Sequence, residues 1–135
     1  MALHLIKLCV GADSVEELRA WRAERARRGV PPIVPTRQTP KRAAELLDGG
    51  SLYWVIKGMI LVRQPILSIA TLDSGPQPCR IDLGPELILT APQPRRPLQG
   101  WRYLSAADAP PDLPTGEGAE VPQDLARQLR EIGAW

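Results

Sequence analysis

The chain has 135 residues, which is enough to bury one hydrophobic core and too few for two comfortable ones. Hydrophobic residues make up 44% and charged residues 24%, an ordinary globular composition that argues against disorder throughout. No stretch approaches the ~20 apolar residues that a membrane-spanning helix needs. Lys7 interrupts the apolar start, no basic leader precedes it, and two cysteines are too few for a disulfide framework. We therefore expect a cytoplasmic protein with reduced thiols and no membrane contact.

Charge is distributed unevenly, although the net charge is only +2. Residues 1–105 hold 15 basic and 9 acidic side chains (+6), whereas residues 106–135 hold 2 basic and 6 acidic side chains (−4). Most basic side chains are arginine, whose planar fork of donors suits phosphates, carboxylates and stacking on bases. A GC-rich genome would explain much of the arginine excess but not the segregation. The pattern favours a single domain over 1–105, an acidic Pro/Gly-rich connector over 106–121 and a helix over 122–135.

The N-terminal segment predicts a strand followed by a helix. Residues 3–10 are aliphatic and almost free of charge, which is typical of a strand. Ser14 and Glu17 form a capping box, so a helix should follow to about Arg28. The residues on its apolar face are Val15, Leu18 and Trp21.

The next segments predict a connector, a short helix and three strands. Prolines make residues 30–40 a loop or an extended connector. A helix is expected over 41–48, before two glycines. Residues 51–57 and 59–72 are rich in β-branched and aromatic side chains, and 79–83 is another short strand.

The remaining chain is richer in proline. Pro65 needs an edge position or a kink within its strand, and residues 85–89 read as a turn or a short helix. Residues 91–104 form a Pro/Arg segment, and 105–122 an extended surface tail. The C-terminal helix should pack back on the domain through Leu125, Leu129 and Ile132. The order of elements predicts an α+β fold with a mainly antiparallel sheet, or a small β-barrel flanked by helices.

Metal binding and nucleophilic catalysis are poorly supported. Zinc needs three or four suitably spaced ligands, yet His4 is the only histidine, and Cys9 and Cys79 stand far apart. A serine or cysteine nucleophile needs a nearby base, and no GxSxG elbow is present. We therefore expect no metal or other cofactor, and a non-catalytic role is favoured.

Two clusters could carry a function. The first lies at the two central strands, where Tyr53 and Trp54 point to opposite faces and Lys57 and Arg63 flank them. A strand buried on both faces is the favoured interpretation, but the two cations must reach solvent or a partner.

The second cluster combines cations and aromatic rings within nine residues. Single-stranded nucleic acid is bound by cations on phosphates and by aromatic faces on bases, and flanking prolines reduce the entropy lost on binding. Alternatively, the two rings anchor a loop to the core while the arginines stay solvated. The members are Arg95, Arg96, Gln99, Trp101, Arg102 and Tyr103.

Five strings are distinctive in combination: LHLIKLCVG (3–11), YWVIKG (53–58), VRQPI (62–66), RRPLQGWRYL (95–104) and DAPPDL (108–113). In these strings the chain resembles a family of small bacterial proteins catalogued only as a domain of unknown function. The resemblance covers nearly the whole chain and implies no activity, substrate or catalytic residues.

A second likeness rests on the order of three segments: ELLDGG (45–50), SLYWVIKG (51–58) and ILVRQPILSI (60–69). This order is similar to the pseudouridine-synthase-and-archaeosine-transglycosylase (PUA) superfamily with its ASCH and EVE branches. That likeness implies a small β-barrel that binds RNA or modified bases. Some ASCH relatives are amidohydrolases using Lys, Thr and Glu, but Ser51, Leu52 and Tyr53 follow the glycines here, so no catalytic set carries over.

Our first hypothesis is a non-catalytic RNA-binding module. Arg95, Arg96 and Arg102 would contact phosphates, and Trp101 would stack on a base with help from Tyr53 or Tyr103, while Lys57 and Arg63 extend the surface. A second hypothesis is an assembly factor that binds a protein partner through the C-terminal helix. A third is a small enzyme that acts on a nucleobase with Lys57 and a carboxylate in a cleft.

Overall fold

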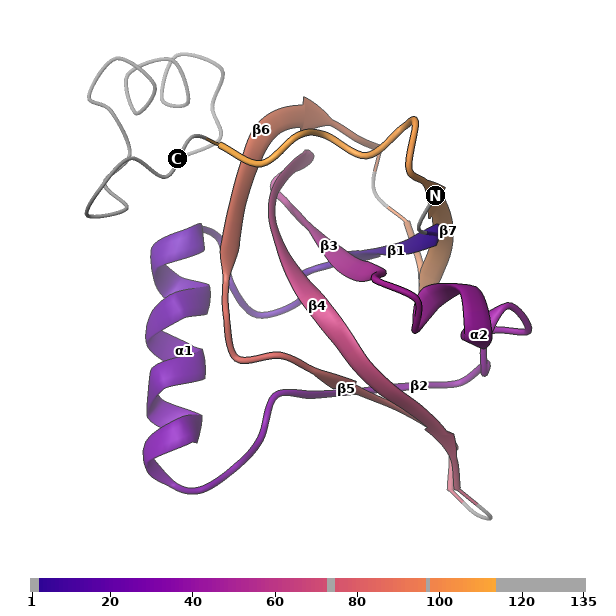
Figure 1. Ribbon diagram of the computed structural model, residues 1–135. Helices are drawn as coiled ribbons and strands as arrows, with labels where there is room; N and C mark the ends of the chain where they lie inside the picture. Colours follow the sequence, from indigo (N-terminus) through magenta and orange to yellow (C-terminus); the bar gives the residue numbers. More distant parts are fainter. Residues whose placement is uncertain (1–2, 73–74, 97, 114–135) are drawn as a thin grey trace.

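The structure is a computed structural model that describes residues 3–72, 75–96 and 98–113 (Figure 1). Seven strands and two helices form these parts of the chain. In order they are β1 (Leu3–Leu8), α1 (Val15–Arg27), β2 (Ile33–Thr36), α2 (Ala43–Leu46), β3 (Ser51–Ile56), β4 (Met59–Thr71), β5 (Cys79–Leu83), β6 (Ile88–Pro94) and β7 (Trp101–Ser105). The expected C-terminal helix, with its stripe of leucine and isoleucine, lies outside the described residues.

The seven strands form one curved, mainly antiparallel sheet, which confirms the predicted α+β class (Figure 1). The sheet is open, with the order β2-β5-β4-β3-β1-β7, and β6 pairs with β4 beside this path. Only β1 and β3 run parallel among the paired strands. The curvature places α1 on one side of the strands and α2 on the other, as Figure 1 shows. β2 and β7 are therefore the two ends of the sheet.

The long strand β4 changes partner at Pro65. Its first half pairs with β6 as far as Arg63, and its second half pairs with β5 from Ile66 onward. Proline has no amide hydrogen to donate to a neighbouring strand, so the junction between two partners suits it. Pro65 was expected at a kink or an edge position, and it lies where β4 exchanges β6 for β5 as its neighbour.

Hydrophobic side chains fill both faces of β3, as the favoured interpretation predicted. Leu52, Trp54 and Ile56 join the larger core cluster, which also receives residues from both helices. Tyr53 and Val55 join a smaller cluster on the opposite face with side chains of β1, β4 and β7. Every residue of β3 is buried, so this strand lies at the centre of the domain.

Helix α1 begins as predicted but packs with fewer residues. Ser14 Oγ accepts a hydrogen bond from the Glu17 amide at 3.0 Å, while Glu17 reaches the Asp13 amide rather than that of Ser14. Val15 and Leu18 are buried, but Trp21 is 44% exposed. The apolar face therefore contacts the core only along the first turns of the helix.

Several local expectations need correction. A turn or short helix was expected over 85–89 and a Pro/Arg segment over 91–104, but these residues contribute the strands β6 and β7. The connector 30–40 contributes β2, which pairs antiparallel with β5, because Pro35 tolerates a strand at the end of a sheet. The second helix shortens to α2, whose N-terminal Arg42 makes no side-chain cap. The chain turns away at Gly49 and Gly50, and a Cβ at Gly50 would lie 2.3 Å from the Leu46 carbonyl oxygen, so only glycine fits there.

The beginning of the acidic connector is bound to the domain. Asp112 forms an isolated antiparallel bridge with Thr90, and the Leu113 amide donates to the Leu89 carbonyl at 2.9 Å. Residues 114–121 lie outside the described parts of the chain. Cys9 and Cys79 are buried and unpaired, and no helix among the described residues is long and apolar enough to cross a membrane.

Candidate nucleic-acid interface

Strand β7 carries the second cluster at one end of the sheet. It pairs only with β1, in a register that sets Trp101 opposite Lys7 and Tyr103 opposite Leu5. Side chains alternate between the two faces of a strand, so both aromatic rings lie on one face and Arg102 on the other. The edge position leaves Arg102 and Tyr103 exposed while Leu104 is buried.

The two rings of β7 link one end of the sheet to the other. Trp101 Nε1 donates to the Gln38 carbonyl at 2.9 Å, and the Tyr103 hydroxyl accepts from the Arg42 amide at 3.1 Å. The ring centroids are 5.0 Å apart at an interplanar angle of 68°, an edge-to-face arrangement. Trp101 also packs partly against the larger core cluster. Trp101 thus packs against the core in the way that the anchoring alternative expects, whereas Tyr103 is exposed and joins no core cluster.

A hollow of about 570 Å³, which we call the basic groove, lies between the two ends of the sheet. Three cations line it: Lys7 from β1, Arg37 from the end of β2 and Arg102 from β7. No carboxylate of the described residues lines it, and the other polar side chains are mainly amides and one hydroxyl. The remaining lining residues are Pro35, Thr36, Gln38, Gln77, Gln99, Gly100 and Trp101.

A second hollow, of about 690 Å³, borders β7 on the side of Arg95 and Arg96, and we call it the arginine hollow. Arg95, Arg96 and Arg102 line it together with one acid, Asp108. Gln99 and Arg102 line both hollows, so the two form one continuous cationic surface around the edge strand. The other lining residues are Ile6, Pro94, Leu98, Tyr103 and Leu104.

Backbone carbonyls rather than carboxylates hold the guanidinium of Arg102. Its Nη1 donates to the Gln99 and Trp101 carbonyls at 3.0 and 2.9 Å. The ion pairs in the described parts of the chain involve other arginines, at 27, 28, 42, 63 and 80. The cations of this surface therefore form no ion pair with the described residues, although Asp108 lies in the arginine hollow.

The structure separates two of the predicted site residues from this surface. Tyr53 is only 4% exposed and stands edge-on to His4, with ring centroids 5.1 Å apart. Arg63 donates two hydrogen bonds of 2.8 Å to Asp112 and a third, of 2.7 Å, to Ser51 Oγ. This pairing lowers the pKa of Asp112, and burial raises the pKa of Tyr53. Tyr53 therefore belongs to the interior of the domain, and Arg63 is held in a partly exposed ion pair.

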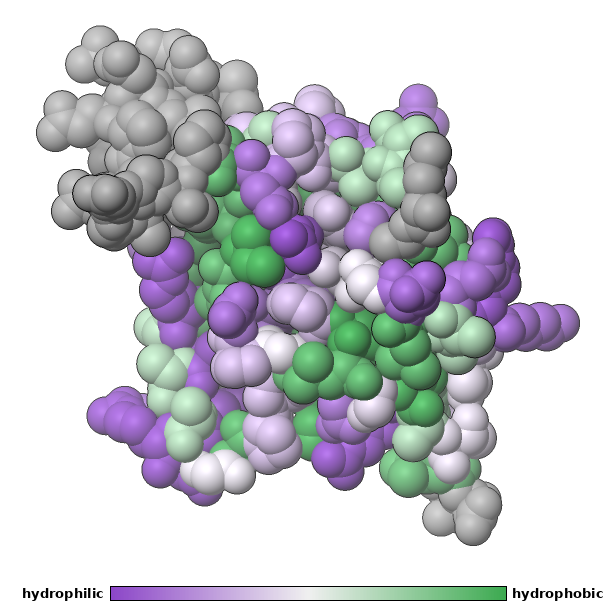
Figure 2. Space-filling view, viewed as in Figure 1, coloured by the Kyte–Doolittle hydropathy of each residue, from purple (hydrophilic) through white to green (hydrophobic). Residues whose placement is uncertain are grey.

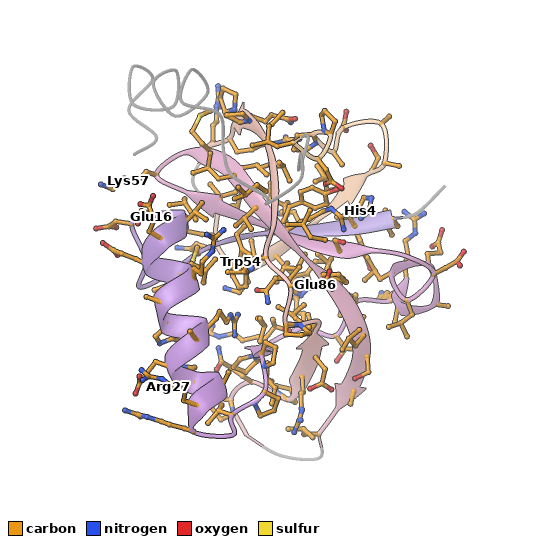
Figure 3. All side chains as sticks on the ribbon, turned by 60° about the vertical axis from the view of Figure 1, so that its left-hand side comes forward. His4, Glu16, Arg27, Trp54, Lys57 and Glu86 are labelled. Carbon is orange, nitrogen blue, oxygen red and sulfur yellow. The ribbon has the colours of Figure 1, made fainter. Side chains whose placement is uncertain are left out.

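Lys57 occupies the exposed turn between β3 and β4 (Figure 3). It takes a left-handed backbone conformation (φ 49°), followed by Gly58 (φ 80°), and the Arg95 amide donates to the Gly58 carbonyl at 2.8 Å. The turn therefore lies beside the backbone of Arg95, although Lys57 lines neither hollow.

Sequence reasoning missed half of the basic groove. Lys7 was visible as the one charge in an apolar strand, a signal that the residue must reach solvent. Arg37, Gln38 and Gln77 stood in stretches read as connectors and turns. Only the curvature that brings β2 toward β7 places them in the groove, and no local pattern encodes that approach.

No group of three or more His, Cys, Asp or Glu side chains in the described ranges is placed to hold a metal ion. No curated protein and no solved structure matches the chain. A family model described as a protein of unknown function (DUF1489) matches residues 5–135. The weaker likeness to the PUA superfamily is not confirmed. The match spans almost the whole chain, and the protein therefore belongs to the DUF1489 family.

Proposed function

We propose that the protein binds single-stranded RNA along β7. The observation that carries this proposal is the basic groove, where three cations and, among the residues that the structure describes, no carboxylate surround the partly exposed ring of Trp101. Proteins that hold single strands combine a cationic path for the backbone with aromatic platforms for the bases. The groove supplies both.

The arginine hollow extends the path around the edge of the sheet. Arg102 belongs to both hollows, so a backbone that contacts it can continue toward Arg95 and Arg96 on one side or toward Lys7 and Arg37 on the other. Arginine suits phosphate because its planar fork donates two parallel hydrogen bonds. Tyr103, at the border of the second hollow, offers a further ring.

The geometry favours this function over a nucleobase enzyme. That alternative needs Lys57 beside an acid in a deep cleft, whereas Lys57 lies on an exposed turn. The assembly-factor alternative depends on Leu125, Leu129 and Ile132, which are outside the described residues.

The decisive experiment compares two triple variants with the same change in charge. In the site variant, Arg95→Gln, Arg96→Gln and Arg102→Gln are combined. In the control, Arg19→Gln, Arg27→Gln and Arg28→Gln are combined on and just after α1. Because both lose three positive charges, long-range attraction falls equally and only local contact differs.

Binding to a labelled single-stranded RNA is measured by fluorescence anisotropy across a series of salt concentrations. Log affinity should fall with log salt, with a slope of about −0.7 for each phosphate contacted. We expect the site variant to lose at least about tenfold in affinity and to show a flatter slope, and the control to stay near the parent. Absence of binding by the parent at low salt, or equal losses in both variants, would refute the proposal.

Trp101 separates stacking from charge. Trp101→Ala should weaken binding by about 1–3 kcal/mol without changing the salt slope, because stacking releases no counterions. Trp101 also bonds to Gln38, so Trp101→Phe, which retains an aromatic face, is the matched control. Restored binding in the phenylalanine variant would identify the ring face as the active feature. Circular dichroism checks that both variants fold.

A further inference from the structure

A third hollow, of about 240 Å³, lies between α1 and the strands and is unused by the RNA-binding proposal. The end of β1, the start of α1 and part of β2 line it, and Trp54 reaches it from β3. Figure 3 shows Trp54 between α1 and the sheet. We call this hollow the tryptophan pocket.

The walls of the tryptophan pocket are largely apolar and aromatic. Leu18, Val34 and Trp54 are buried, whereas Trp21 remains 44% exposed. Helix α1 leaves this space because only its first turns pack on the core. The volume is below the range of about 300–1,000 Å³ typical of pockets for drug-sized ligands, so a small molecule fits best.

Arg22 brings a guanidinium with one unpaired nitrogen to this apolar space. Its guanidinium carbon lies 4.9 Å from the ring centroid of Trp21 and 5.9 Å from that of Trp54. Its Nε is buried and has no hydrogen-bond acceptor among the described residues. Burial lowers the pKa of Arg22, but a guanidinium remains charged in proteins. A ligand oxygen that accepts a hydrogen bond from such a buried donor removes the free-energy cost of leaving the donor unsatisfied.

The rest of the lining leaves the charge uncompensated. Lys7 is the second cation, and no carboxylate in the described part of the chain lines the pocket. Cys9 cannot serve as a counter-ion, because burial raises the pKa of its thiol even though Arg22 and Lys7 act in the opposite direction. The pocket thus combines cationic donors with flat apolar walls.

We propose that the tryptophan pocket binds a small monocarboxylate with a flat apolar body. The two carboxylate oxygens match the fork of Arg22, and the apolar body lies against the indole rings. A doubly charged phosphate monoester suits the site less, because its larger hydration must be removed beside apolar walls. This site is separate from the basic groove, although Lys7 and Pro35 line both.

Benzoate is the probe, and neutral benzamide is its matched analogue. Both are titrated by calorimetry into the full-length chain. We expect benzoate to bind at least tenfold more tightly than benzamide. Arg22→Met, which keeps the length and apolar stem of the side chain, should lose this preference. Arg27→Met on the same helix removes a charge outside the pocket and should leave benzoate binding unchanged.

The indole N–H signals in a nuclear magnetic resonance spectrum locate the ligand. The signals of Trp21 and Trp54 should shift with benzoate and that of Trp101 should not, with assignments from Trp21→Phe, Trp54→Phe and Trp101→Phe. If Arg22→Met fails to fold, Arg22→Lys replaces it and should weaken benzoate several-fold, because lysine retains the charge but lacks the fork. No benzoate binding, equal affinity for benzamide, unchanged binding in the folded Arg22 variant or a shift confined to Trp101 would overturn the proposal.

Discussion

Two segments of similar composition differ in burial and in the partners of their cations. Residues 51–66 and residues 95–104 each combine aromatic side chains with cations. In the first, Tyr53 and Trp54 are buried and Arg63 is bound to a carboxylate. In the second, Tyr103 is partly exposed and Arg102 is held by carbonyls alone among the described residues.

The position of each strand in the sheet accounts for this difference. β3 has β4 on one side and β1 on the other, and hydrophobic clusters cover both of its faces. Among the described strands, β7 pairs with β1 alone. An edge strand meets fewer partners, so its long polar side chains keep their charges available. On the face that Figure 2 shows, separate hydrophobic patches alternate with hydrophilic side chains.

The largest expected effect concerns the interior of the β3 segment. Trp54 is 6% exposed, and its Nε1 donates to Gln64 Oε1 at 2.9 Å. Trp54→Ala should lower the free energy of unfolding by about 3–5 kcal/mol, since it leaves a cavity and deprives the buried Oε1 of Gln64 of its hydrogen-bond donor. Urea denaturation measures the change. The half-exposed Trp21 provides the control, and Trp21→Ala should cost well under half as much. Comparable losses in the two variants would mean that the buried and the half-exposed tryptophan contribute equally to stability.

An intermediate effect is expected for the ion pair between Arg63 and Asp112. Asp112→Asn keeps the shape of the side chain but removes its charge. It should lower the free energy of unfolding by about 1–2 kcal/mol at pH 7, a loss that stays moderate because the carboxylate is partly exposed. The pKa of Asp112 is lowered in the folded state, so its contribution is complete above the unfolded pKa and is lost as the pH falls through the folded pKa.

Urea denaturation of the parent and of Asp112→Asn at several pH values checks this prediction. The gap between the two proteins should be constant above about pH 5 and should close in more acidic solution. Asp108→Asn is the control, since Asp108 makes no ion pair in the described parts of the chain. A gap that persists at the lowest accessible pH would mean that the contribution of Asp112 does not depend on its charge.

The smallest effect on stability is expected for the three arginines of the arginine hollow. The combined Arg95→Gln, Arg96→Gln and Arg102→Gln variant should change the unfolding free energy by less than about 0.5 kcal/mol for each substitution, because Arg96 and Arg102 are exposed and the buried Nε of Arg95 has no hydrogen-bond acceptor among the described residues. Thermal denaturation provides the measurement. A loss of several kcal/mol would contradict this prediction and would show that these arginines support the fold.

Local patterns in the sequence predicted most of the elements, because strands and capped helices leave periodic and capping signals. Ser14 marks the start of α1, and the buried run at β3 was recognisable from its β-branched and aromatic residues. β2 and β6 were missed because their prolines resemble a connector, and β7 was missed because it follows a segment rich in proline and arginine. The linkage of Trp101 to Gln38 and the ion pair of Arg63 with Asp112 join residues far apart in the chain, and no local signal could reveal either. The basic groove was therefore predictable from β7 but not from the β2 side.

The register of β1 has a consequence for the order in which the protein folds during synthesis. Leu5 is made before both of its partners, so it meets Leu52 only when β3 is made and Tyr103 only when β7 is made. Contacts of such long sequence separation slow folding. Until β7 arrives, the nascent chain presents a free edge of β1 that can pair with a neighbouring chain. Chains that stop before Trp101 should consequently aggregate, whereas chains that extend through residue 113 carry both β7 and the segment that pairs with β6.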